Sequence, residues 1–293
     1  MLAQRLKPDL KFRLRSAYNQ LQFTLARTRL LQSQDSVYDD LLKVNEIRYR
    51  VGQISSLEKI NGESQYKRIQ FALKVSRNEL RNAKYQFNLL MGRPNDTTYI
   101  PAEVLRKSSY VFEFTPVDTS YLSNNPLLDY SYRNVMLNKN LLKVERRRRL
   151  PGPVLGYLNQ GASDTGLQPR LRLGVTLPVW QWIFQANVNA AKKGIQIAQT
   201  QQQLTAYQLN TEYARAQADF RQFKDNVNYF ETVGLAEASE ILRNARESFR
   251  LGSITYYQYL QNVELTYTIR QNYLETLKNY NQAVINLIYL KGE

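Results

Sequence analysis

One short segment occurs twice in this chain, and this duplication restricts the possible folds more than any other feature. Tyr49–Ser56 (YRVGQISS) recurs as Phe249–Tyr256 (FRLGSITY), with the same order of residue types 200 positions later. The correspondence extends without a gap on both sides, for example from Leu42 to Leu242. An internal repeat sets the architecture before any local assignment. Each copy is a long helical pattern interrupted once by a glycine turn, which predicts two helical hairpins.

Proline and glycine are scarce enough to leave several long uninterrupted segments, which favours long helices over a compact mixed fold. Apolar residues at a spacing of three and four follow the second copy on both sides of its turn and indicate coiled-coil packing. Helices of this length cannot bury themselves, so they need partners from their own repeat and from other copies of the chain. The composition of residues 95–120 differs from that of the helical segments and predicts a loop or short strands. The predicted helices cover 9–50, 56–90, 126–149, 185–250 and the segment between Gly252 and Gly292.

The segment Arg170–Leu177 is the clearest strand signal, because apolar and polar residues alternate in it without error. An earlier arm, 154–160, is joined to it by turn-rich residues, and together they predict a β-hairpin. The alternation fits a soluble strand with one face on a core, or a membrane barrel strand with one face toward lipid. Arginines on the polar face and two tryptophans after the strand favour the barrel, but the pattern alone leaves both interpretations open. The two faces are Leu171, Leu173, Val175 and Leu177, and Arg170, Arg172, Gly174 and Thr176.

Composition excludes several functional classes. The chain has no cysteine and no histidine, which removes disulfides, thiolate chemistry, the usual zinc ligands and the commonest general base. We therefore expect no catalytic residues, no metal site and no cofactor, and we do not expect an enzyme. The net charge of +15 suits nucleic acid or an anionic membrane surface, but no nucleic-acid-binding motif occurs. No apolar run reaches the length of a transmembrane helix, and the N-terminus lacks the apolar core of a signal peptide.

The run Glu145–Arg149 ends the predicted middle helix with four successive arginines. One interpretation is a solvated helix end, where cations interact favourably with the C-terminal dipole. The other is a contact with membrane headgroups. Both interpretations stay open at the level of the sequence.

In order and spacing, these features resemble the TolC-type outer-membrane channel subunits (outer membrane factors) of tripartite efflux and secretion systems. Three stretches carry the likeness, which covers nearly the whole chain. They are the paired tips around Gly52 and Gly252, the strand 173–179 that runs into an alanine-rich helix at 187–191, and the ending 271–284. The segment 280–290 and the piece 156–160 look closest to heavy-metal cation efflux members of this family.

The resemblance implies a mainly α fold. Long antiparallel coiled-coil helices, in two repeats spaced by 200 residues, would carry a short β-hairpin that contributes to a trimeric outer-membrane β-barrel. The implied segments are a first periplasmic helical hairpin over 1–94, an equatorial segment and helix over 95–150, a barrel hairpin over 151–182 and a second periplasmic hairpin over 183–293. The family pattern has two strand pairs and an earlier start, so we expect an N-terminally truncated form.

The resemblance also implies partners and a location. The chain would form a homotrimer in the outer membrane with a periplasmic extension, in contact with outer-membrane lipid and without nucleic acid. A periplasmic adaptor protein would meet the hairpin tips, and an inner-membrane pump would supply the energy. The expected adaptor-binding tips are Arg50, Val51, Gly52, Arg250, Leu251 and Gly252.

Three further sets of residues acquire roles from the resemblance. Family members can carry an acidic constriction ring just past the second tip, but the matching residues Gln258 and Gln261 are neutral, so an acidic cation-binding gate is not expected, although rings of amides could still constrict the pore. The residues of this possible pore constriction are Glu58, Asn61, Gln258 and Gln261. The expected lumen-facing strand residues are Arg170, Arg172 and Thr176, and the expected membrane-interface residues are Trp180 and Trp182.

The leading functional hypothesis is a passive exit duct of a tripartite efflux system, which conducts substrates, heavy-metal cations among them, after export by the pump. The alternative is a structural coiled-coil scaffold without a membrane pore. A scaffold explains the heptads and the basic charge but not the alternation in Arg170–Leu177. A nucleic-acid-binding helical protein and an enzyme rank below both.

Overall fold

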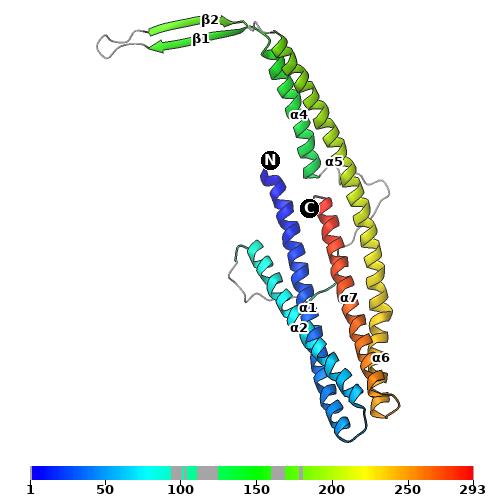
Figure 1. Ribbon diagram of the computed structural model, residues 1–293. Helices are drawn as coiled ribbons and strands as arrows, with labels where there is room; N and C mark the ends of the chain where they lie inside the picture. Colours follow the sequence, from blue (N-terminus) through cyan, green and yellow to red (C-terminus); the bar gives the residue numbers. More distant parts are fainter. Residues whose placement is uncertain are drawn as a thin grey trace, which may run out of the picture. The chain divides into compact units, whose positions relative to one another are not determined.

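The two helical hairpins predicted from the repeat are present, and their equivalent helices have matching bounds. The computed structural model describes residues 2–93, 101, 104–110, 125–159, 169–177 and 181–292. Within these residues the chain forms two compact units, 119–211 and the combination of 2–118 with 212–293. Figure 1 labels the elements of both units.

The larger unit contains both copies of the repeat. In the first copy, α1 (Leu2–Arg50) turns at Gly52 into α2 (Ser56–Leu90). In the second copy, α6 (Leu235–Arg250) turns at Gly252 into α7 (Tyr256–Leu290). Both α2 and α7 contain 35 residues and begin four positions after their glycine. The sequence spacing of the repeat is therefore preserved in the structure.

The long helix that leads into the second tip is interrupted once. It consists of α5 (Gln181–Tyr229), the π-helical turn η1 (Phe230–Gly234) and α6. The turn ends at Gly234, where a Cβ atom would lie 2.9 Å from Phe230 Cδ1. The predicted unbroken helix over 185–250 was therefore wrong in two details, since it begins at Gln181 and contains a π-turn that periodicity does not reveal.

The predicted start of the first helix was also wrong. It was placed at Asp9, after Pro8, whereas α1 begins at Leu2 and has Pro8 inside it. At this position proline lacks the N–H that would bond to the carbonyl of residue 4, and its ring crowds that carbonyl, but the helix continues through it. All the other expected helix bounds were close to those observed.

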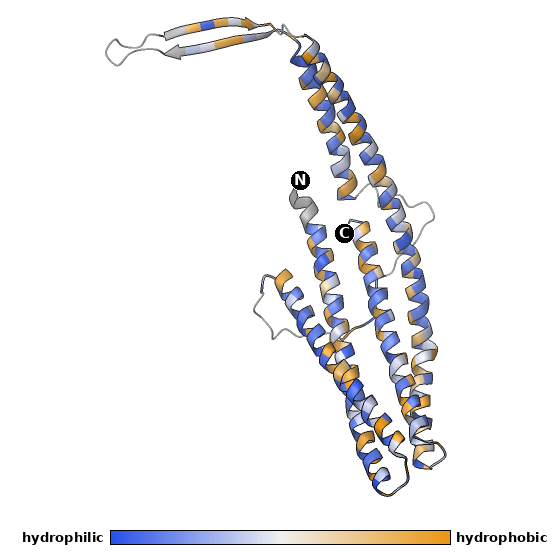
Figure 2. Ribbon diagram, in the orientation of Figure 1, coloured by the Kyte–Doolittle hydropathy of each residue, from blue (hydrophilic) through white to orange (hydrophobic). Residues whose placement is uncertain are grey.

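Apolar stripes hold the larger unit together. One buried cluster joins α1 and α2 through Leu21, Ala83 and Phe87. A larger one lies toward the tips, where residues of α1, α2 and α6 surround α7. Figure 2 shows that apolar residues occupy only part of each helix surface. The members of the larger cluster are Tyr38, Leu41, Ile69, Ala245, Tyr256, Tyr259, Leu260, Val263 and Tyr267.

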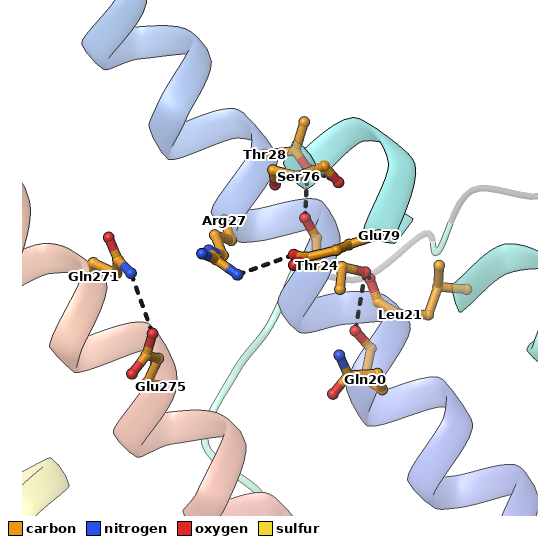
Figure 3. A network of polar contacts seen from close by, with 9 residues as sticks. All are labelled: Gln20, Leu21, Thr24, Arg27, Thr28, Ser76, Glu79, Gln271 and Glu275. Carbon is orange, nitrogen blue, oxygen red and sulfur yellow. Dashed lines mark hydrogen bonds and ion pairs between the residues drawn. The ribbon is translucent and has the colours of Figure 1, made fainter. Parts of the chain in front are cut away.

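A pair of buried polar side chains interrupts the apolar contact between α1 and α2. Figure 3 shows Thr28 of α1 facing Ser76 of α2, with their hydroxyl oxygens 2.8 Å apart. Arg27, the residue before Thr28, donates to Glu79 across the same pair of helices at 3.0 Å. Thr24 donates back to the Gln20 carbonyl of its own helix. Because the buried Thr28 and Ser76 hydroxyls are paired with one another, the two helices can approach closely there without a penalty for unpaired hydroxyl groups.

The smaller unit consists of a helix pair and a hairpin. Helix α4 (Pro126–Arg147) begins with Asn125 as its N-cap, and the cap side chain accepts from Leu127 N, as expected for a helix opened by Asn-Pro. It contacts α5 where Gly194 meets Asn138, because a Cβ there would lie 3.2 Å from Asn138 Oδ1.

The predicted hairpin is formed by β1 (Gly152–Asn159) and β2 (Pro169–Thr176), paired antiparallel. Its register places Leu155 opposite Leu173 and Gly156 opposite Arg172. The hairpin leaves the end of α4 and returns to the start of α5 (Figure 1). The expected loop at 161–166, most of the expected loop or strands at 95–120, and Trp180 lie outside the described residues.

Candidate functional site

The two tips have the same backbone. Both glycines lie in the left-handed region, with φ of 72° at Gly52 and 75° at Gly252. In the first tip, Gln53 N donates to Arg48 O at 2.9 Å, and in the second, Ser253 N donates to Ser248 O at 2.8 Å. This is the Schellman arrangement, which satisfies the last carbonyls of a helix and requires a residue without a Cβ penalty.

Each tip presents an apolar residue and an arginine to solvent. Val51 is 63% exposed and Leu251 is 69% exposed, although both are large apolar residues. Arg50 is exposed, and Arg250 is held by Glu247 of its own helix at 2.7 Å. A Cβ on either glycine would meet nothing within 4 Å, so the backbone there is open to approach.

The two tips contact one another through aromatic side chains. The Arg48 guanidinium lies 4.3 Å from the centroid of the Phe249 ring, so the end of α1 touches the end of α6. Phe249 stacks on Tyr259 with 4.8 Å between the ring centroids. Cation–π and stacking contacts of this kind contribute about 0.5–1.5 kcal/mol each. The predicted tip residues therefore extend outward from a shared, packed base.

Two buried tyrosines, Tyr256 and Tyr38, also belong to this packed base. Tyr256 donates its hydroxyl to Leu41 O at 3.4 Å, across a separation of 215 residues. Burial raises the pKa of Tyr256, and burial together with the nearby Glu264 carboxylate raises the pKa of Tyr38 to about 12. The raised pKa values extend the pH range in which both phenols are neutral further into the alkaline region.

The four predicted constriction residues lie at the starts of α2 and α7. Glu58 accepts from Ser55 N at 2.9 Å, and Gln258 accepts from Thr255 N at the same distance, which completes a capping box in each copy. Their side chains therefore have a structural partner in this chain. Asn61 is half-buried and Gln261 is exposed. A constriction formed by these residues stays a prediction.

A polar clamp beside the π-turn was not expected from the sequence. Glu231 of η1 accepts from Lys107 at 3.2 Å and from the Tyr273 hydroxyl at 3.3 Å. The neighbouring Asn281 side chain donates to Arg106 O and accepts from Ser108 N. Residues 104–110 are thus fastened to α7 by side chains, although they form neither helix nor strand. Only the polar Asn281 within an apolar stripe could have signalled this contact.

The hairpin has one face of large apolar side chains that the described part of the chain leaves uncovered. Leu155, Leu171 and Leu173 are 78%, 80% and 78% exposed, and Tyr157 and Val175 on the same face are also exposed. The other face carries Arg172, Thr176 and the backbone position of Arg170, as predicted from the alternation. A two-stranded hairpin is at best marginally stable in water, and exposed apolar patches of this kind mark interaction sites.

Of the two predicted interface tryptophans, the structure describes Trp182. It lies in the first turn of α5 rather than at the end of β2, and it is 65% exposed. Its position is still only a few residues from the strand. Whether it lies at a membrane interface stays a prediction.

None of the helices described is both long and apolar enough to cross a membrane. In the same part of the chain, no three His, Cys, Asp or Glu side chains lie together in a way that could hold a metal ion.

No protein-family model matches the chain, and no curated protein does. Solved structures do match. The Campylobacter jejuni CmeC outer membrane channel has a TM-score of 0.82 at 16% identity, over 99% of this chain and 63% of that one. CusC, described in terms of folding and transmembrane channel formation, has a TM-score of 0.83 at 16% identity, over 98% of this chain and 69% of that one. The open state of the Neisseria gonorrhoeae MtrE outer membrane channel has a TM-score of 0.79 at 16% identity, over 97% of this chain and 66% of that one.

These likenesses establish the fold. The chain has the fold of TolC-type outer-membrane channels, with long helical hairpins and a β contribution, as the resemblance in the sequence predicted. It spans about two thirds of the length of these structures.

Proposed function

We propose that this chain is a subunit of an outer-membrane exit channel in a tripartite efflux system, and that it conducts substrates passively. The observation that carries the proposal is the uncovered apolar face of the β-hairpin, formed by Leu155, Tyr157, Leu171, Leu173 and Val175. A face of this composition is stable against lipid and unstable against water. The fold, shared with proteins named as outer membrane channels, supports the same location.

Membrane insertion of this hairpin requires other copies of the chain. Two strands leave two open edges, and each unpaired backbone N–H or C=O in hydrocarbon costs several kcal/mol. Closure with strands from other subunits removes those edges. Helix α2 also exposes large apolar residues, including Phe71 at 68% and Leu89 at 67%, on a surface that another subunit would cover. Both features support assembly with other copies of the chain, and the number of copies that we propose is three.

The tips are the proposed docking surface for a periplasmic adaptor. Their left-handed glycines allow a partner backbone to approach closely, while Val51 and Leu251 offer apolar contact and Arg50 and Arg250 offer hydrogen bonds. The competing interpretation is that the glycines only end two helices.

The location and assembly are tested by the mass of the purified chain in detergent and in a parallel preparation without it. We expect a trimer that depends on detergent. A monodisperse monomer or dimer without detergent would contradict the channel and favour the coiled-coil scaffold, since a scaffold needs no lipid.

The tips are tested by export resistance in cells that produce Gly52→Leu/Gly252→Leu. We expect loss of efflux, with the trimer and its membrane fraction unchanged. Gly92→Leu is the matched control, because Gly92 ends α2 with φ of 71° and equally open surroundings but lies at the opposite end of that helix. Equal effects of the control and the tip variant would mean that the glycines only end helices.

The cargo stays a prediction. The resemblance of segment 280–290 to heavy-metal efflux members suggests cations, but the identity to CusC and to CmeC is 16% in both cases. Substrate choice in such an assembly would reside largely in the pump. A resistance profile against metal salts and organic toxicants would decide between the two classes of cargo.

A further inference from the structure

The end of α4 concentrates positive charge immediately before the hairpin. Arg146, Arg147 and Arg148 are exposed and Arg149 is half-buried. Over 125–159, 169–177 and 181–211, the chain has eleven Lys and Arg but only two acidic residues, Asp129 and Glu145. The whole chain has 40 against 25. The described part of the smaller unit is therefore far more basic than the rest.

Among the described residues, Arg148 is the one member of this arginine cluster, Arg146–Arg149, that forms an ion pair within the chain. The nearest carboxylate, Glu145, pairs with Arg148 at 2.9 Å, and its Oε2 atom is buried without a hydrogen-bond partner. The helix dipole accounts for basic residues in a last turn. It does not account for four in succession. Arg146 and Arg147 lie about 100° apart around the helix, and Arg148 and Arg149 follow its last residue, so the four do not share one face. Such an arrangement suits ligands on several sides.

Large apolar side chains adjoin the cluster. Leu150 and Trp182 are both 65% exposed, and Ile183 is 50% exposed. Gly152 pairs with Thr176, so the end of α4 and the start of α5 meet at the same end of the hairpin (Figure 1). Arginine beside exposed tryptophan and leucine is the composition of a membrane–water interface rather than of a solvated helix end.

The hairpin sets the depth of this cluster. Each strand has eight described residues and is about 26 Å long at 3.3 Å per residue, so at a barrel tilt of about 35–45° it rises about 20 Å and covers most of the apolar band. The apolar band of an outer-membrane barrel is about 25 Å tall. If the hairpin crosses the bilayer, as the proposed function requires, the arginines lie at the level of the lipid phosphates. This step rests on the proposed function.

We infer that the arginine cluster binds the phosphate groups of anionic phospholipids at the membrane surface. The guanidinium group presents paired N–H donors that match phosphate oxygens and stays charged at any physiological pH. Each arginine near an anionic surface adds attraction, and the attraction decays within a Debye length. The cluster would hold the hairpin at a fixed depth and give the subunit a preference for anionic lipid.

The test compares flotation of the full chain with vesicles of phosphatidylcholine alone and with vesicles that also contain phosphatidylglycerol. We expect partitioning about tenfold stronger into the anionic vesicles, with the difference lost in about 1 M salt, where the Debye length is about 3 Å. The variant Arg146→Gln/Arg147→Gln/Arg148→Gln/Arg149→Gln should lose the preference but still float with phosphatidylcholine.

A charge-matched control removes four positive charges elsewhere in the same unit, through Arg133→Gln, Lys139→Gln, Lys192→Gln and Lys193→Gln. It should keep most of the preference. The fourfold Arg→Lys variant should also keep it, and this variant decides the question if the glutamine variant does not fold. A preference that survives in the glutamine variant, or that disappears equally in the control or in the lysine variant, would overturn the inference.

Two further outcomes separate this inference from the proposed function. A chain that floats equally with both vesicle types belongs in a membrane but has no anionic-lipid site, so the inference alone fails. A chain that floats with neither type contradicts the membrane location and the inference together. If duplex DNA displaces the chain from anionic vesicles at equal phosphate concentration, the cluster serves nucleic acid and the lipid assignment is wrong.

Discussion

Helices α2 and α7 are equivalent by sequence repeat, equal in length and equally placed after a glycine tip, yet their surroundings differ. Helix α7 contains fourteen buried residues and α2 contains seven. The buried residues of α7 point toward both α1 and α6, whereas α2 exposes apolar residues such as Ile60 and Phe71. A duplicated backbone therefore has one copy at the centre of the larger unit and one at its edge.

Side chains at the start of each helix account for this difference. Tyr256, Tyr259, Leu260 and Val263 form the buried stripe of α7. The equivalent positions of α2 hold Ser56, Lys59, Ile60 and Glu63, a set that cannot form a continuous apolar face. The two copies share their turns and their helix lengths. Differences between residues at a spacing of three and four decide which of the two helices is buried at the centre of the unit.

The largest expected contrast is between Leu260→Ala and Ile60→Ala. Leu260 is 1% exposed and Ile60 is 57% exposed, although they occupy equivalent positions. We expect the free energy of unfolding to fall by about 3 kcal/mol for Leu260→Ala, because a buried isopropyl group is lost and a cavity remains, and by less than about 0.5 kcal/mol for Ile60→Ala. Urea unfolding of both variants measures this at protein concentrations too low for assembly. Equal losses in the dissociated chain would contradict this contrast, whereas a loss for Ile60→Ala that appears only in the assembled protein would mean that another subunit covers Ile60.

Gly62→Ala tests close packing that only the first copy has. A Cβ at Gly62 would lie against Asn45 Nδ2 and 2.9 Å from the Tyr256 hydroxyl. We expect a loss of about 1–2 kcal/mol in the free energy of unfolding, since overpacking exceeds the gain in helix propensity.

The second copy supplies the control for this variant. Its equivalent residue, Asn262, is only half-buried, so Asn262→Ala should be nearly neutral. The double variant Gly62→Ala/Asn45→Ala should recover stability, because it introduces at position 45 the alanine that the second copy has at 245. Failure of this rescue would show that Asn45 is not what opposes a larger residue at position 62.

The tips are where the two copies should behave alike. Gly52→Ala and Gly252→Ala should each lower the free energy of unfolding by about 1 kcal/mol, because the left-handed backbone strains any residue with a Cβ. Thermal unfolding of the two single variants checks this. A difference of more than about 1 kcal/mol between them would indicate that one tip is restrained by contacts beyond its own turn.

The smallest expected effect concerns the ion pair that joins α2 to α7. Arg68 and Glu264 are 2.7 Å apart, but their side chains are 58% and 42% exposed. A double-mutant cycle with Arg68→Ala and Glu264→Ala should give a coupling energy of about 0.5 kcal/mol that decreases with salt. A coupling above about 2 kcal/mol, unchanged by salt, would mean that this pair is desolvated in the assembled protein.

Features that depend on short stretches of chain were predictable. The Schellman turns at Gly52 and Gly252, the bounds of α2, the Asn125 cap and the strand alternation follow from local hydrogen bonding and side-chain periodicity. The repeat at a constant spacing predicted the two helical hairpins. Together with the strand, it carried the resemblance to outer-membrane channels.

Features that depend on distant neighbours were not predictable. Tyr289 donates to Asp9 across 280 residues, and Asn19 donates to Lys278 O across 259. Such contacts decide which face of a helix is covered, and they placed α7 rather than α2 at the centre. The Glu231 clamp and the requirement for Gly62 have the same origin. The sequence by itself therefore determined the elements and their turns, because these arise within a few residues. Only the tertiary structure decided which elements are buried, because burial depends on which side chains meet across the whole chain.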